Sequence, residues 1–254
     1  MFKLFKKHTS VADTPKKIPQ HIAFICDGNR RWAENRGLPP LAGHQAGIAN
    51  FENMVDWFMK RGVTTITFFI FSTENWNRSD EEVNFLMDLF YTQLNQNLKH
   101  ALEHNLRYRV IGSRDRLPKK LANLCDKLEK ESAENTGGTV VFALNYGGQD
   151  EIVRAVNEAI DNGEHVDKDS FETFMDTGDL LPIDLMVRTS NECRISNFLL
   201  WKLAYAELLF IPEHWPDLVR SEKLWNKVLD EYNNRDRRFG GGKKKDYSGK
   251  NKGK

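Results

Sequence analysis

The sequence predicts an α/β protein, a single domain with a mostly parallel central sheet of about six strands flanked by helices. Two observations lead to this prediction. Short apolar, β-branched or aromatic runs recur along the chain, and longer stretches with helical periodicity lie between them. Strands that alternate with helices form parallel sheets covered on both faces. The predicted strands are His21 to Cys26, Thr64 to Phe71, Tyr108 to Ile111, Thr139 to Leu144, Ile183 to Val187 and Leu208 to Ile211.

The helical stretches follow the strands in chain order. One helix should begin near Asp80, because Ser79 to Glu82 resemble a capping box and an apolar stripe follows from Val83 to Phe90. The apolar segment Phe198 to Ala206, just before Glu207, also reads as helical. The remaining predicted helices are Ala46 to Lys60, Leu117 to Glu134 and Asp150 to Ile160, and the one near Asp80 extends to Glu103.

Length and composition indicate one large folded unit. The chain has 254 residues, of which 40% are apolar, and a formal net charge of +1. These values exclude a disordered chain and, by bulk charge, a basic nucleic-acid-binding protein, so no nucleic-acid partner is expected. Cys26, Cys125 and Cys193 are far apart and lack C-x-x-C spacing, which indicates free thiols and a cytoplasmic location.

The two ends of the chain differ from its middle. Residues 1–17 form a basic segment expected to be flexible, and residues 243–254 form a Lys/Gly-rich tail expected to be disordered. The catalytic domain should therefore span residues 18–242. No apolar run is long enough to span a bilayer, so at most a peripheral contact with anionic lipid is expected, through lysines near the tail.

Polar residues at the carboxyl ends of the predicted strands are the first candidates for a site, because ligands gather there in open parallel sheets. The first strand runs into Asp27, Gly28, Asn29, Arg30 and Arg31. Glycine permits close approach of a ligand, and two arginines favour an anion such as diphosphate. A carboxylate beside a polyanion requires a hard cation between them, and Mg²⁺ is the natural one. Alternatively, Asp27 caps a helix and the arginines face solvent.

Two further strands end in similar clusters. The second is followed by the dense polar segment Phe71 to Arg78, and the fifth by Arg188 to Asn197, which carries two arginines and several hydroxyls. Three such runs at one edge of a sheet indicate a site with a second phosphate-bearing ligand. Either run taken alone is equally compatible with an ion-pair network. Glu207 is either a structural carboxylate or a second metal ligand.

The motifs of this chain that point to one family are His21 to Ala33, Gly43 with His44 and Gly47, Phe71 to Arg78 with Glu82, Asn145 to Gly148, Arg188 to Trp201, Tyr205 to Glu207, and Trp215 to Asp217. Together they resemble the cis-prenyltransferases, and the resemblance covers roughly residues 18 to 242. It implies magnesium-dependent condensation of isopentenyl diphosphate with an allylic diphosphate, such as farnesyl diphosphate, to a Z-polyprenyl diphosphate.

The resemblance also implies roles for individual residues. Magnesium would bind Asp27 with help from Glu207, and Asn75 would lie near the proton that is removed. Arg237 to Gly241 look like the carboxyl-terminal motif of homodimeric members, so a homodimer is expected. The allylic diphosphate would contact Gly28, Asn29, Arg30, Arg31 and His44, isopentenyl diphosphate would contact Arg188, Arg194 and Ser196, and further substrate-binding residues would be Trp32, Ser72, Thr73, Glu74, Trp76, Arg78 and Ile195.

The chain departs from the family pattern at a few positions. Pro40 stands where an arginine is common, Asn191 replaces a usual glycine, and Cys193 replaces a residue that is often histidine. The growing hydrocarbon would need an apolar tunnel between the strands and the Val83 to Phe90 helix. Ile70 stands where long-chain members often have alanine, which predicts a short or medium-chain product.

Three other functions fit the sequence less well. A strand running into Asp-Gly also resembles an aspartate-dependent phosphatase, but such sites use a second aspartate two residues on, where this chain has Asn29. A non-catalytic prenyltransferase-like partner subunit would be expected to lack the metal carboxylate and diphosphate arginines, and this chain has them. Trans-prenyltransferases are helical and carry aspartate-rich motifs, which this chain lacks.

Overall fold

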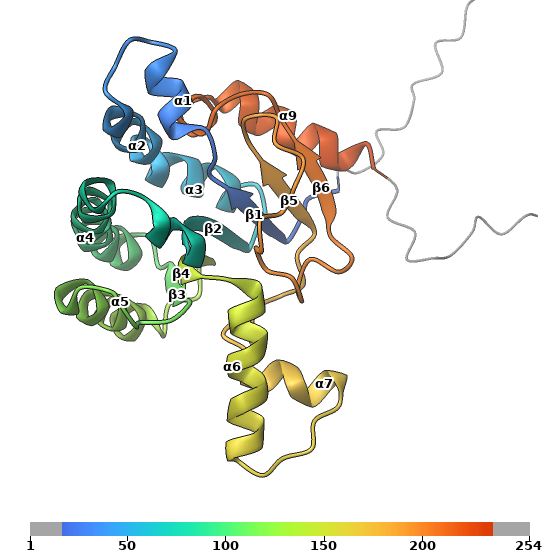
Figure 1. Cartoon of the computed structure of the whole chain (residues 1–254). Coiled ribbons are helices and arrows are strands. Elements are labelled where there is room, and N and C mark those ends of the chain that lie inside the picture. Colours follow the sequence, from blue (N-terminus) through green and yellow to red (C-terminus); the bar gives the residue numbers. More distant parts are fainter. Residues whose placement is uncertain (1–16, 236–254) are drawn as a thin grey trace, which may run out of the picture.

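The computed structural model describes residues 17–235, and these contain one six-stranded sheet in the order β3-β4-β2-β1-β5-β6 (Figure 1). Every pair of neighbouring strands is parallel. β1 lies between β2 and β5, so the segments that follow these three strands meet at one edge of the sheet. The strands are β1 His21–Ile25, β2 Thr65–Ser72, β3 Arg107–Ile111, β4 Thr139–Tyr146, β5 Leu185–Arg188 and β6 Glu207–Phe210.

Helices flank the sheet, and the predicted α/β class is confirmed. α6 runs away from the sheet with α7 beside it, whereas α4 and α5 lie side by side (Figure 1). Among the described residues, no helix combines the length and apolarity needed to cross a membrane. The helices are α1 Asn29–Glu34, α2 Pro40–Ile48, α3 Phe51–Met59, α4 Asp80–Glu103, α5 Lys119–Ser132, α6 Gly148–Asp161, α7 Lys168–Phe171, α8 Trp215–Leu218 and α9 Glu222–Asn233, with 3₁₀ turns at Thr73–Asn77 and Glu172–Phe174.

Two of the predicted helices are wrong. The stretch from Ala46 to Lys60 is divided between α2 and α3, because Asn50 adopts a left-handed φ of 71° that an α-helix cannot contain. Its side chain donates to the Val219 carbonyl at 3.1 Å, which holds the break in place. The segment Phe198 to Ala206 forms turns instead of a helix.

The start of α4 is close to the prediction. Ser79 is the N-cap, and its hydroxyl accepts from the Glu82 N–H at 3.3 Å. The carboxylate of Glu82 does not complete a capping box, because it accepts from Arg78 and Arg30 instead. Glu82 therefore forms two ion pairs at the edge of the sheet in place of one capping hydrogen bond.

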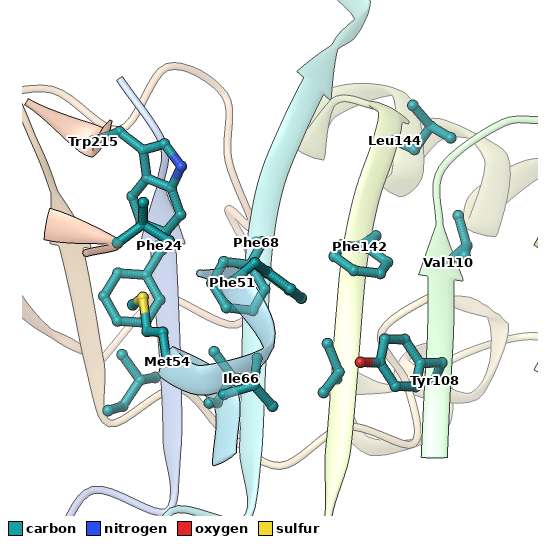
Figure 2. Packing of buried hydrophobic residues seen from close by; sticks show 14 of the residues in the cluster. Phe24, Phe51, Met54, Ile66, Phe68, Tyr108, Val110, Phe142, Leu144 and Trp215 are labelled. Atoms are coloured by element: carbon teal, nitrogen blue, oxygen red, sulfur yellow. The ribbon is translucent and has the colours of Figure 1, made fainter. Parts of the chain in front are cut away.

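The main core lies between one face of the sheet and helices α3, α4, α5 and α9. Phe24, Phe68 and Phe142 occupy matching positions on β1, β2 and β4 and form a row across the sheet (Figure 2). Phe51 of α3 packs onto this row, with its ring centroid 4.7 Å from that of Phe68. Burying each such ring contributes about 2–3 kcal/mol. This row holds α3 against the middle of the sheet.

The opposite face is covered mainly by the turns after β5. Phe198, from this segment, stacks on Phe69 of β2 with ring centroids 4.5 Å apart. Small residues of the sheet, Ala23 and Ala143, belong to the same cluster. Since small side chains let a neighbouring chain approach closely, this face accommodates an irregular segment where a helix would not fit as tightly.

Strand β2 contains a bulge at its carboxyl end. Its pairing with β4 shifts register on both sides of Phe71, so strict alternation ends after Phe69. Ile70 and Phe71 both pack on the side of α3 and α4, as Phe68 does. Ile70 therefore lies on the same face of the sheet as Phe68, and the bulge adds Phe71 to that face.

A buried histidine at the start of β1 makes stability depend on pH. Burial lowers the pKa of His21 to about 4, although its ring nitrogens pair with the Leu181 carbonyl and the Thr67 hydroxyl. The unfolded chain, with a histidine pKa of about 6.5, takes up the proton first. The contribution of neutral His21 to the free energy of unfolding is complete above pH 6.5 and is lost as the pH falls toward 4. Between pH 7 and pH 5 the loss should be about 2 kcal/mol.

Urea unfolding of the wild type and of His21→Gln at pH 7 and pH 5 measures this contribution. The variant should be less stable at pH 7, and its free energy of unfolding should change less between the two pH values. Equal pH dependence of the two proteins would show that His21 is not the group responsible.

Candidate active site

A cavity of about 350 Å³ lies beside the carboxyl ends of β1, β2 and β5. One part of its wall is polar, with side chains from the loops that follow these strands. The other part is apolar, with side chains from β2, α3 and α4. The polar wall includes Asp27, Asn29, His44, Ser72, Asn75, Arg78, Arg188, Arg194 and Ser196, and the apolar wall includes Ile48, Phe51, Phe68, Ile70, Phe71, Leu86, Leu89, Phe90, Leu94 and Phe142.

Asp27, two residues after β1, lies between two arginines. Arg31, one helical turn later, donates to Oδ1 at 3.0 Å, and Arg188, at the end of β5, donates to Oδ2 at 2.9 Å. Burial raises the pKa of Asp27, but the two arginines more than offset this and hold its pKa below the usual range. The carboxylate is therefore ionised at neutral pH. It is a hard oxygen donor of the kind that Mg²⁺ prefers.

Arg188 is the most buried cation of the site. Its side chain is 4% exposed, and it donates to Ser196 Oγ at 2.8 Å as well as to Asp27. Its Nε has no hydrogen-bond partner among residues 17–235. A buried guanidinium N–H without a partner is costly, and an anion in the cavity would supply an acceptor.

Glu82 organises a second group of charges. It accepts from Arg30 at 3.1 Å and from Arg78 at 3.0 Å, and lies 3.5 Å from His44 Nε2. Burial lowers the pKa of His44 to about 4, aided by Arg78 and Arg30 and opposed by Glu82. The imidazole is therefore neutral at pH 7. Cavity residues Arg78 and His44 are thus held in place by a carboxylate that does not itself line the cavity.

Gly28 allows the loop after β1 to pass close to the loop after β5. It adopts a left-handed φ of 94°, and a Cβ at this position would lie 1.8 Å from Ser190 Oγ. The Ser190 hydroxyl donates to the Asp27 carbonyl at 3.0 Å. Asn29 then begins α1, and its Nδ2 donates to the Cys26 carbonyl at 3.1 Å. These contacts orient the turn that presents Asp27.

Comparison with known proteins identifies the family. Residues 25–240 match the family model described as "Putative undecaprenyl diphosphate synthase". An isoprenyl transferase of Thermotoga maritima is 40% identical over 230 residues, covering 89% of this chain and 98% of the relative. The chain belongs to the undecaprenyl diphosphate synthase family. It is accordingly a prenyltransferase, and the aspartate-dependent phosphatase is set aside.

Other relatives agree with this assignment. A Vibrio cholerae protein named ditrans,polycis-undecaprenyl-diphosphate synthase ((2E,6E)-farnesyl-diphosphate specific) is 42% identical over 230 residues, covering 88% of this chain and 91% of the relative. Among solved structures, lavandulyl diphosphate synthase from Lavandula x intermedia, in complex with dimethylallyl diphosphate, aligns with a TM-score of 0.83 and 32% identity. The alignment covers 88% of this chain and 98% of that one.

Within this family fold, the structure brings most of the predicted site residues to one edge of the sheet. Gly28, Arg30 and Arg31 flank the cavity without lining it. Arg194 lines it, and its exposed guanidinium pairs with Glu192, which accepts from Arg31 at 2.8 Å. The predicted residues that line the cavity are Asp27, Asn29, His44, Ser72, Asn75, Arg78, Arg188, Arg194 and Ser196.

Asn75 is positioned by the backbone of its own loop. Its Oδ1 accepts from the Ser72 N–H at 3.0 Å in the 3₁₀ turn after β2. Its neighbours in that turn are tied elsewhere. Glu74 accepts from Asn197 at 3.1 Å, and the Trp76 indole donates to Asn145 at 2.7 Å. Four other predicted site residues, Thr73, Glu74, Trp76 and Ile195, do not line the cavity.

Trp32 of α1, another predicted site residue, does not line the cavity. It packs with Ala33 and Ala46, and its indole N–H donates to Asp217 at 2.7 Å. The side chain therefore joins α1 to α8, and a contact between Trp32 and substrate stays a prediction.

Glu207 does not line the cavity either. It begins β6 and pairs in register with Leu185, at the amino-terminal edge of the sheet. Asp27 follows the carboxyl end of β1, about 16 Å further along the strand direction. Glu207 accepts from Arg235 at 3.0 Å. Asp27 and Glu207 of one chain therefore lie at opposite edges of the sheet and do not face the same ion, and a role of Glu207 in metal binding stays a prediction.

The departures from the family pattern have local explanations. Pro40 is the first residue of α2, where a missing N–H costs nothing. Asn191 has a φ of 58°, a conformation that asparagine tolerates in place of glycine. Cys193 is exposed, and the structure adds no reason to make it a metal ligand. The motif from Arg237 to Gly241, on which the homodimer prediction rests, lies outside the described residues.

Sequence reasoning missed two polar residues in the apolar part of the cavity. Asn97 is fully buried, and Gln93 donates to its Oδ1 at 3.0 Å. The Asn97 Nδ2 has no partner within the described chain. The signal was available, because Asn97 continues the stripe of Phe90 and Leu94 at helical spacing. A polar residue at such a position points to a function or to a bound partner.

Because the loops after β1 and β5 lie close together at Gly28, Gly28→Ala should lower the stability of the fold far more than Gly37→Ala does. Both glycines have positive φ, of 94° and 64°, so both substitutions incur backbone strain of about 1–2 kcal/mol. A Cβ at Gly37 meets nothing within 4 Å, whereas at Gly28 it collides with Ser190. Thermal unfolding of the two variants isolates the collision. Similar melting temperatures would contradict the close approach of the two loops.

Proposed function

We propose that this chain is a magnesium-dependent cis-prenyltransferase that condenses isopentenyl diphosphate with an allylic diphosphate to give a Z-polyprenyl diphosphate. The observation that carries this proposal is the cavity, whose arginine-rich wall adjoins an apolar interior. That combination suits a ligand with a diphosphate at one end and a hydrocarbon at the other. The names of the Vibrio cholerae and Lavandula relatives, both diphosphate synthases, support the same substrate class.

We place the two diphosphates on opposite sides of Asp27. The allylic diphosphate would bind near Asn29, Arg30, Arg31 and His44, and isopentenyl diphosphate near Arg188, Arg194 and Ser196. Asp27 contacts an arginine from each group. Mg²⁺ in proteins is commonly held by one or two carboxylates together with substrate phosphates, so Asp27 fits as the protein ligand.

In the reaction, the allylic carbon–oxygen bond breaks and a carbon–carbon bond forms to the terminal carbon of isopentenyl diphosphate. A proton then leaves the new chain. Bound Mg²⁺ would supply charge stabilisation to the departing diphosphate. The preorganised arginines add to this stabilisation, and the fixed positions of the two diphosphates align the reacting carbons. The Asn75 amide, oriented by the Ser72 N–H, is proposed to lie near the departing proton.

Asp27→Asn should abolish magnesium-dependent product formation while the protein stays folded. The amide keeps the size of the side chain but removes the anionic oxygen that would hold the cation. Incubation with Mg²⁺, isopentenyl diphosphate and farnesyl diphosphate, followed by product sizing, measures turnover, and circular dichroism checks the fold. Asp88→Asn, a matched change on an exposed part of α4, is the control and should retain turnover. Near-normal turnover by folded Asp27→Asn would contradict the proposal.

Ile70→Ala should lengthen the product, because Ile70 lines the apolar part of the cavity at the bulge of β2. A β-branched side chain is stiff, and forcing a hydrocarbon past it would cost about 1–3 kcal/mol. We therefore propose a short or medium-chain product for the wild type. Ile66→Ala, on the same strand but outside the cavity lining, is the control and should not change the length. Undecaprenyl-length product from both wild type and Ile70→Ala would contradict this proposal.

A further inference from the structure

A cluster of metal-binding side chains lies away from the active site, where the end of α4 meets α3. It consists of Asp56 from α3, His100 from α4 and His104, the C-cap residue of α4, and one ligand atom from each lies within 4.8 Å of the others. The ring of His100 also contacts Tyr108, near the start of β3. This start belongs to the amino-terminal edge of the sheet, whereas Asp27 follows the carboxyl-terminal edge.

The geometry of the cluster is close to that of a zinc site. Asp56 Oδ1 lies 3.1 Å from His100 Nε2, and Oδ2 lies 3.0 Å from His104 Nδ1. Ligands at 2.0–2.1 Å from a tetrahedral zinc ion are about 3.3 Å apart. The two histidines are separated by four residues on a helix, which places them on one face, one turn apart. Only small rotations of the three side chains would therefore make room for an ion.

Tyr108 supplies the outer contact that histidine ligands usually have. Its hydroxyl lies 2.9 Å from His100 Nδ1. Burial raises the pKa of Tyr108, so the hydroxyl stays protonated but can still accept a hydrogen bond. When Tyr108 accepts from Nδ1–H, Nε2 carries the lone pair and can bind an ion placed between it and Asp56.

Burial and charge also suit a cation. His100 is almost fully buried and Asp56 is largely so, whereas the side chain of His104 is 40% exposed. An ion can therefore enter beside His104, and a water molecule can complete the coordination on that side. Glu52, one helical turn before Asp56, adds a second negative charge that acts on Tyr108.

We propose that Asp56, His100 and His104 form a binding site for a divalent transition-metal ion, with zinc favoured by the two imidazoles and one carboxylate. Mg²⁺ would be a poor occupant, because it prefers oxygen ligands. The bound ion would fasten the end of α4 to α3. About one turn earlier, Asn97 lines the cavity, so the site would hold this part of its wall in place. Without metal, the same groups form a hydrogen-bonded triad.

The test is a titration of the metal-free full-length chain with Co²⁺, followed by visible absorption, and with Zn²⁺, followed by calorimetry. One equivalent should bind, with the absorption of tetrahedral Co²⁺. His104→Ala, an exposed substitution that should not disturb folding, should weaken binding about a hundredfold or more, because a direct ligand is lost. Tyr108→Phe should weaken it about 10- to 100-fold through loss of the outer contact.

Three controls separate this site from other metal-binding groups. His165→Ala removes another exposed histidine, Cys193→Ser removes an exposed thiol, and Asp27→Asn alters the active site. All three should bind one equivalent as the wild type does. The proposal is overturned if the wild type binds no stoichiometric Co²⁺ or Zn²⁺, if binding survives His104→Ala unchanged, or if Cys193→Ser abolishes it.

Discussion

The ion pair between Asp27 and Arg188 joins two distant parts of the chain at the centre of the sheet edge. Arg188 ends β5 with its guanidinium almost out of contact with water, and a buried cation requires a matching anion. Asp27, after the neighbouring strand β1, provides that anion. Because its other oxygen accepts from Arg31 of α1, the same carboxylate also fixes the first helix. The loops after β1 and β5, which carry most of the polar wall, are therefore positioned by one side chain.

Glu82 has a comparable role on the other side of the cavity. Glu82 lies in the first turn of α4, after the N-cap Ser79, and its carboxylate accepts hydrogen bonds from Arg78 and Arg30. Both carboxylates thus keep arginines in fixed places before any ligand arrives. For a reaction whose charge develops on a departing diphosphate, cations that need no rearrangement are the most effective stabilisers. The neutral state of His44 is consistent with this arrangement, because burial and the nearby arginines lower its pKa.

Helix α4 runs from the polar wall of the cavity along its apolar wall. Its first turn carries Glu82, and Leu86, Phe90 and Leu94 in its middle line the cavity. His100 lies in its last turn, and His104 is its C-cap residue. A helix of 24 residues is about 36 Å long, which is enough to cross the whole sheet. The length of the apolar cavity and the position of its inner end therefore depend on how this helix is held at both ends.

The sequence by itself determined the parallel α/β fold and most of the polar wall. Buried strands of a parallel sheet are continuous apolar runs, and the residues that end them must share one edge, so Asp27, Ser72 and Arg188 were predicted together. The start of α4 was also predictable from the local sequence, because Ser79 caps the helix. Each of these features depends on neighbours along the chain or on a general rule of sheet geometry.

Tertiary structure alone decided the rest, because the deciding contacts join residues far apart in sequence. The break at Asn50 is held by Val219, and the turns after Phe198 depend on a stacking partner in β2. The position of Glu207 at the opposite edge from Asp27 is decided by the register of β6 with β5. Asp56 and His100 are 44 residues apart and meet only because the sheet packs α3 beside α4. Periodicity predicts which face of a helix is buried, but packing decides which side chains meet there.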